Sequence, residues 1–251
     1  MVRGIEKFRQ AFAGFEGKYS LIGGVACGLL MDEAQIEYRE TKDFDVVLII
    51  EAMDEAFGKA LWDFIKKGDY EIRQKSSGEP EFYRFKNPKD VSYPEEIELF
   101  SRKSVGLHYE EKDRLTSIHI SDEISSLSAI LLDDAYYNFL RSGVRAIGDI
   151  QVLSELYIIP FKAKAWLDLS GRKEKGEQVD SKNISKHKND VFRLLQLVQN
   201  SERVMLPQEV KNDMKRFVEC MEKESIDFKA LKVRYKKDVA LELLKVVYDL
   251  Q

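Results

Sequence analysis

The chain has 251 residues, with 40 Lys and Arg against 44 Asp and Glu, and a formal net charge of −4. A hydrophobic fraction of 44% excludes a mostly disordered chain, and the acidic balance argues against a surface that coats nucleic acid throughout. The two cysteines form no Cys-x-x-Cys pattern, and the three histidines are too scattered for a His-built metal site. The first residues lack the apolar core of a signal peptide and no stretch is suited to crossing a membrane, so we expect a cytoplasmic protein without membrane contact.

The N-terminal half alternates between helical and strand patterns. Apolar residues at helical spacing predict helices over 5–16, 25–34 and 54–67. Short apolar runs predict strands over 19–22 and 43–50, the second apolar enough to be buried on both faces of a sheet. Further β-type runs follow at 70–74, 81–86, 96–100 and 115–120. This order predicts a mixed sheet with helices on one face.

The second half shows mainly helical patterns. A short strand is expected at 153–159, then a helix beginning at Pro160, then an exposed polar loop over 171–187. Later helices are expected at 189–198, 207–223 and 228–250. The predicted fold class is therefore α/β (α+β), with a mixed-sheet domain over 1–125 and a mainly helical domain over 126–251.

Two glycines and two aspartates form the most informative pattern in the chain. Gly23 and Gly24 fall between a predicted strand and helix, where the backbone can approach a ligand and helix N–H groups can hold a phosphate. Asp43 and Asp45 begin the next strand, and the two-residue period of a strand places both carboxylates on one face. Paired carboxylates repel unless a cation lies between them, and they suit Mg²⁺ together with substrate phosphates. The alternative is that both acids simply face solvent.

A third carboxylate would complete a metal site for phosphoryl transfer. Glu98 is the best candidate, because it lies between apolar residues on the strand at 96–100, and Glu96 on the same face is the reserve choice. The alternative is an outward-facing glutamate on an edge strand. The lysine-rich segment 171–188 is either a guide for RNA or a nucleotide, or a solvated loop.

Together these residues resemble the nucleotidyltransferase superfold shared by DNA polymerase β-like enzymes. Within it, the pattern is similar to the AbiEii/AbiGii toxin nucleotidyltransferases, in which a strand ending in Gly-Gly precedes a helix and then Arg-x-Thr/Ser-x-Asp-x-Asp. The polar positions of that motif are matched here by Arg39, Thr41, Asp43 and Asp45. The family also carries a lysine on a later helix, matched by Lys162 or Lys164, and then an aspartate, matched by Asp190.

The resemblance implies two sets of residues in a cleft between the two domains. The catalytic and metal-binding set is Asp43, Asp45 and Glu98. The nucleotide-binding set is Gly23, Gly24, Arg39, Thr41, Lys162, Lys164 and Asp190. With Mg²⁺ or Mn²⁺ as cofactor, the implied reaction moves a nucleoside monophosphate from an NTP to a hydroxyl of an RNA 3′ end, a protein or a small molecule. The toxin resemblance also implies an antitoxin protein as partner.

Two other functions stay open from the sequence. One is a catalytically silent relative that binds a nucleotide or a protein through the same cleft. The other is a metal-dependent nuclease that uses the same carboxylates, needs no NTP and shortens nucleic acid.

Overall fold

The computed structural model of the protein describes residues 2–74, 80–101, 105–109, 114–118, 130 and 133–250. The chain divides into two compact units, which we call the sheet unit and the helical unit. The sheet unit comprises Met1–Ile124 and Val144–Leu153; the helical unit comprises Ser125–Gly143 and Ser154–Gln251. The boundary expected at 125–126 lies outside the described residues, and the sequence pattern did not indicate the return to the sheet unit at 144–153.

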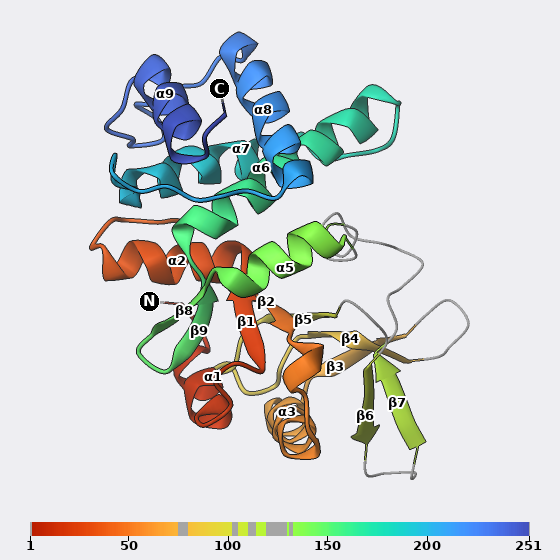
Figure 1. Ribbon diagram of the computed structural model, residues 1–251. Coiled ribbons are helices and arrows are strands. Elements are labelled where there is room, and N and C mark those ends of the chain that lie inside the picture. The colour runs from red at the N-terminus through yellow and green to blue at the C-terminus, as the bar shows by residue number, and fades with distance from the viewer. Residues whose placement is uncertain are drawn as a thin grey trace. The chain divides into compact units, whose positions relative to one another are not determined.

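Seven strands form the main sheet of the sheet unit, in the order β3-β4-β5-β2-β1-β9-β8 (Figure 1). Their bounds are β1 Tyr19–Ile22, β2 Asp43–Leu48, β3 Glu71–Gln74, β4 Pro80–Lys86, β5 Glu96–Phe100, β8 Val144–Ile147 and β9 Ile150–Leu153. β2 runs parallel to β5 and β1 parallel to β9, while the other neighbouring pairs are antiparallel. A separate antiparallel pair is formed by β6 (Val105–Tyr109) and β7 (Arg114–Ile118). The sheet is mixed, and the predicted α/β fold class is confirmed.

The helices α1 (Ile5–Phe12) and α3 (Glu55–Gly68) lie on one face of this sheet (Figure 1). Aromatic side chains fill the layer between these helices and the strands. The Phe8 and Phe12 rings lie 4.4 Å apart, and both contact Tyr19 of β1. Phe44 of β2 lies 5.4 Å from Phe8 and belongs to the same layer. Because side chains alternate along a strand, the two aspartates of β2 point to the opposite face.

The helix α2 (Gly23–Glu33) starts at the residue after β1 ends, with no loop between them. Its residues from Gly24 to Met31 are all buried, as expected for a helix that is apolar on every side. The predicted helix at 25–34 is thus confirmed, but it starts earlier and takes both glycines into its first turn.

The helical unit contains α5 (Asp134–Ser142), α6 (Glu155–Glu174), α7 (Ser181–Leu194), α8 (Gln208–Lys223) and α9 (Lys237–Val247). Trp166 of α6 packs edge-on against Phe217 of α8 at a centroid distance of 5.6 Å, and Phe192 of α7 lies 6.4 Å from the same ring. These contacts form the core of the unit. Among the residues that the structure describes, no helix has the length and apolar character needed to cross a bilayer.

The strand expected at 153–159 is wrong, because α6 is one helix of 20 residues from Glu155 and holds Pro160 in its interior. An interior proline has no N–H to donate, so the carbonyl four residues before it loses its helical partner. That carbonyl belongs to Leu156, and it accepts a hydrogen bond from the hydroxyl of Tyr248 at 2.8 Å. The distant tyrosine compensates for the missing bond and the helix continues through the proline.

The exposed loop expected at 171–187 is also mostly helical. α6 continues to Glu174, and α7 begins at Ser181, where the Asp180 side chain caps it by accepting from the Lys182 N–H at 2.8 Å. The helix expected at 228–250 starts only at Lys237. Polar, largely exposed helical turns have no apolar stripe, so their sequence resembles that of a loop.

Candidate active site

Four carboxylates meet on one face of the sheet, where β2 and β5 run side by side. In the parallel register Asp43 lies beside Glu96, and Asp45 lies beside Glu98. Neighbouring strands are about 4.8 Å apart, so each pair of side chains shares one local environment. Asp43 is exposed and Asp45 is partly exposed. The structure therefore brings the three predicted acids, and the reserve choice Glu96, to one face of two adjacent strands.

The next strand, β4, adds two cations to this face. Arg84 is the register partner of Glu98 and Lys86 is the partner of Glu96. Arg84 Nη2 lies 2.6 Å from Glu98 Oε1, and Lys86 Nζ lies 2.9 Å from Glu96 Oε2. Burial raises the pKa of the Glu98 carboxyl, while the Arg84 guanidinium opposes that rise through its hydrogen bond and charge. Arg84 was not among the residues predicted from the sequence; the available signal was the alternation of Arg84 and Lys86 in the predicted strand at 81–86.

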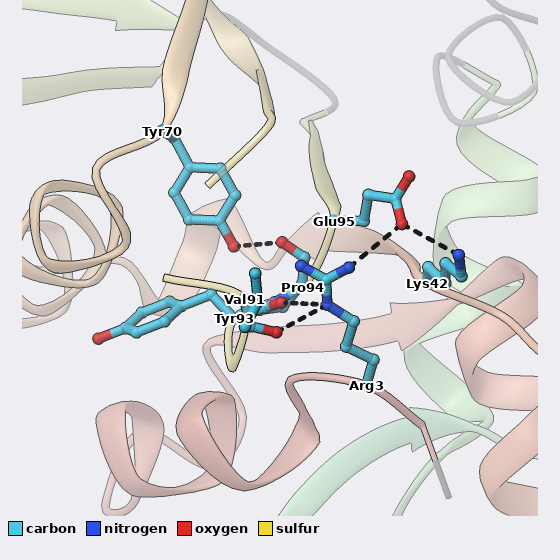
Figure 2. Close-up of polar contacts among 7 residues, drawn as sticks. All are labelled: Arg3, Lys42, Tyr70, Val91, Tyr93, Pro94 and Glu95. Carbon is cyan, nitrogen blue, oxygen red and sulfur yellow. Dashed lines mark hydrogen bonds and ion pairs between the residues drawn. The ribbon is translucent and has the colours of Figure 1, made fainter. Parts of the chain in front are cut away.

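A polar cluster holds the starts of β2 and β5 together (Figure 2). The Glu95 N–H donates to the carbonyl of Lys42 at 3.0 Å, and Lys42 Nζ lies 3.3 Å from Glu95 Oε2. Arg3 lies 3.3 Å from the same oxygen, and its Nε donates to two carbonyls of the segment before β5, at 2.9 and 3.1 Å. Tyr70 donates its hydroxyl to the carbonyl of Pro94 in that segment. Since Lys42 and Glu95 directly precede the two strands, this cluster supports the register that pairs the acids.

The two glycines lie against the polar residues of the Arg-x-Thr-x-Asp-x-Asp motif. Gly23 has φ of +64°, and a Cβ there would meet Asp45 Oδ2 at 1.7 Å. A Cβ on Gly24 would lie 2.8 Å from Thr41 Oγ1 and 3.2 Å from Arg39 Nη2. Only glycine leaves room for this approach. The start of α2 therefore adjoins a carboxylate, a hydroxyl and a guanidinium that are far away in sequence.

In the helical unit, Lys162 and Asp190 form a buried ion pair. Lys162 Nζ lies 2.9 Å from Asp190 Oδ2, with side chains 5% and 0% exposed, and Arg193 approaches the same carboxylate at 3.5 Å. Asp190 lies on α7 and Lys162 on α6, so the pair joins the two helices. The structure thus connects two of the residues that the resemblance predicted for nucleotide binding.

Lys164 has different partners. Its Nζ lies 3.3 Å from Asp168 and 3.2 Å from Asp213, and Asp213 also accepts from the Tyr136 hydroxyl at 3.0 Å. Burial disfavours the charged form of Lys164, but the two carboxylates outweigh burial and raise its pKa. Of the two candidate lysines, Lys162 is therefore the one that pairs with Asp190.

The carboxylates on this face of the sheet are candidate ligands for a divalent cation. Within the described part of the chain, no group of three His, Cys, Asp or Glu side chains is placed to hold one metal ion. Mg²⁺ is commonly held by one or two carboxylates together with substrate phosphates. Asp43 and Asp45 would supply the two carboxylates of that donor set, and Glu98 forms an ion pair with Arg84.

Comparisons with known proteins give one structural match. Neither a family model nor a curated protein sequence matches the chain. A solved structure from H. pylori, described as a "putative nucleotidyltransferase", is similar to it over 98% of this chain and 92% of that one, with 13% identity and a TM-score of 0.41.

Proposed function

We propose that the protein is a metal-dependent nucleotidyltransferase that moves a nucleoside monophosphate from an NTP to a hydroxyl acceptor. The observation that carries the proposal is the close approach of Gly23 and Gly24 to Asp45, Thr41 and Arg39. It combines a helix N-terminus, which favours anions, with carboxylates that suit a divalent cation. A nucleoside triphosphate with its metal ion needs both at once.

Each candidate site residue of the sheet unit has a role in this proposal. The N–H groups of Gly23 and Gly24 at the start of α2 bind phosphate oxygens. The Arg39 guanidinium neutralises part of the phosphate charge, and the Thr41 hydroxyl lies beside this site. Asp43 and Asp45 would hold Mg²⁺ or Mn²⁺. When bound, the ion supplies charge stabilisation at the phosphoryl oxygens.

The reaction is an in-line displacement at the α-phosphorus. The acceptor oxygen forms a bond to phosphorus, the bond to the bridging oxygen breaks, and pyrophosphate leaves while the hydroxyl proton passes to a base. The sequence left two roles for Glu98, a third metal ligand or that base. The nucleotide-binding roles that the resemblance implies for Lys162 and Asp190 stay predictions; in the helical unit the two residues form a buried ion pair.

For the acceptor we propose an RNA 3′ end or a protein, in the context of a toxin that is paired with an antitoxin. The resemblance to the AbiEii/AbiGii toxins motivates this finer assignment. The exposed end of α6 and the start of α7 are compatible with an RNA backbone, since their basic residues outnumber the acidic ones there.

Thermal unfolding tests the proposal, with each of the four NTPs, with and without Mg²⁺, for the wild type and Asp45→Asn. A ligand at about 100 times its dissociation constant adds about 2.7 kcal/mol, which corresponds to a rise of about 5–10 °C in Tm. We expect a Mg²⁺-dependent rise with at least one NTP in the wild type and none in Asp45→Asn. No rise with any NTP, in a protein that unfolds cooperatively, would favour the silent relative or the nuclease.

A further inference from the structure

Arg39 and Thr41, which lie beside Gly24 in the candidate site, belong to a segment of irregular backbone. Residues 36–42 form neither a helix nor a strand, so no regular ladder of backbone hydrogen bonds fixes their place. Thr41 is nevertheless buried, and its Oγ1 would lie 2.8 Å from a Cβ on Gly24. Neighbouring segments must therefore hold this part of the site in position.

Residues 2–4, which we call the strap, contact this irregular segment through Val2. The Val2 side chain is buried, and a Cβ built on Gly28 of α2 would lie 3.4 Å from both Val2 Cγ2 and Thr41 Cγ2. The methyl groups of Val2 and Thr41 thus lie at the same glycine. With its methyl group in this apolar contact, Thr41 has its hydroxyl toward Gly24.

Gly4 brings the backbone of the strap against the backbone of the segment before β5. Its φ is +82°, and a Cβ there would lie 2.2 Å from the N atom of Pro94. Because that atom belongs to the backbone, no side-chain rotation could relieve the contact. A larger residue at position 4 would have to move the segment before β5.

Arg3 binds the same segment through its guanidinium. Its Nε donates to two carbonyls there, at 2.9 and 3.1 Å, and its Nη1 lies 3.3 Å from Glu95 Oε2 (Figure 2). The same Glu95 oxygen lies 3.3 Å from Lys42 Nζ, and the Glu95 N–H donates to the Lys42 carbonyl at 3.0 Å. Lys42 directly follows Thr41, so the strap supports the irregular segment at two neighbouring residues.

We infer that the strap is a positioning element of the nucleotide site, in which Arg3 and Gly4 set the place of Thr41 against Gly24 through the segment before β5. This inference rests on the proposed function, because it assigns positioning residues to the site of that function. Arg3 and Gly4 do not touch the nucleotide. Binding groups must stay within about 0.5 Å of their productive geometry, so moving the strap weakens NTP binding in a chain that still folds.

Gly4→Ala tests the inference without changing any charge. Gly14, just beyond the end of α1, offers a matched control, since its φ is +84° and nothing lies within 4 Å of a Cβ there. Alanine meets the same backbone strain at both positions but collides with Pro94 only at position 4. Should Gly4→Ala fold poorly, Arg3→Met takes its place, with Arg145→Met as the control that removes an arginine from another ion pair of the sheet unit.

Isothermal titration calorimetry with each of the four NTPs in Mg²⁺ measures the dissociation constant separately from the fraction of protein that binds. Unfolded protein lowers that fraction and leaves the Kd of the folded molecules unchanged, whereas a displaced site raises the Kd. Hydrogen exchange of the Glu95 amide, which donates to Lys42, reports on the segment before β5 itself.

We expect Gly4→Ala and Arg3→Met to exchange faster at Glu95 and to bind about tenfold or more weakly to the NTP that the wild type binds most tightly. Both controls should stay within about threefold of the wild-type Kd. A Kd within about threefold of wild type in either folded strap variant would overturn the inference alone, and so would weaker binding with unchanged exchange at Glu95. A wild type that binds none of the four NTPs would overturn the proposed function, and the inference with it.

Discussion

Gly23→Ala is expected to remove the Mg²⁺-dependent response to NTP, while the same change at Gly148 leaves that response intact. Both glycines have positive φ, +64° and +57°, so alanine meets a similar backbone strain at each, about 1–2 kcal/mol. They differ in what surrounds them. A Cβ at Gly23 would meet Asp45 Oδ2 at 1.7 Å, whereas nothing lies within 4 Å of a Cβ at Gly148.

We expect Gly23→Ala to displace the Asp45 carboxylate more than it lowers the free energy of unfolding. The two atoms under 3 Å from the added Cβ are Oδ2 and Cγ of Asp45, which rotation of that side chain can move aside, so we expect the chain still to fold. The displaced carboxylate then no longer lies where it can share a cation with Asp43, and the new methyl group occupies the place where a phosphate would approach the backbone. Thermal unfolding with and without NTP and Mg²⁺ measures both effects. If Gly23→Ala keeps the full rise in Tm with NTP and Mg²⁺, the phosphates do not bind at the start of α2.

Lys162→Met is expected to lower the free energy of unfolding by about 3–5 kcal/mol, because it leaves the carboxylate of Asp190 buried without its main cation. Asp190 is 0% exposed, and Arg193 approaches it only at 3.5 Å. The matched control is Lys164→Met on the same helix. The Lys164 side chain is 25% exposed, so water takes over part of its role and the expected cost is about 1 kcal/mol.

Urea unfolding of the two variants measures this difference. The double variant Lys162→Met/Asp190→Leu should recover much of the loss, because no uncompensated charge remains in the interior. Equal costs for Lys162→Met and Lys164→Met would contradict the assignment of Lys162 to the buried pair. A loss of activity in Lys162→Met reports on the nucleotide site only in protein that is shown to be folded.

The parts of the site that the sequence predicted are those governed by short-range periodicity. Gly23 and Gly24 follow a strand, and Asp43 and Asp45 share a face because they are two residues apart on the next one. Glu98 was placed on its strand for the same reason. These inferences need only local geometry, and the structure arranges the residues accordingly.

What the sequence did not indicate depends on contacts between distant segments. Arg84 reaches Glu98 only because β4 pairs with β5, and Arg3 is 92 positions from Glu95. The choice between Lys162 and Lys164 depends on which side of α6 faces α7. Pro160 marked a helix start in the sequence, but the hydroxyl of Tyr248 lets the helix continue through it. The roles of the site residues stay predictions.

The proposed transfer of a nucleoside monophosphate is measured by following the α-phosphate of the NTP. The protein is incubated with each NTP labelled at the α-phosphorus, with Mg²⁺ and either RNA or protein as acceptor, and both labelled acceptor and released pyrophosphate are quantified. We predict equal amounts of the two products with wild type and neither with Asp45→Asn. Wild-type protein that binds NTP but releases no pyrophosphate, or that shortens the RNA instead, would contradict the proposed nucleotidyl transfer.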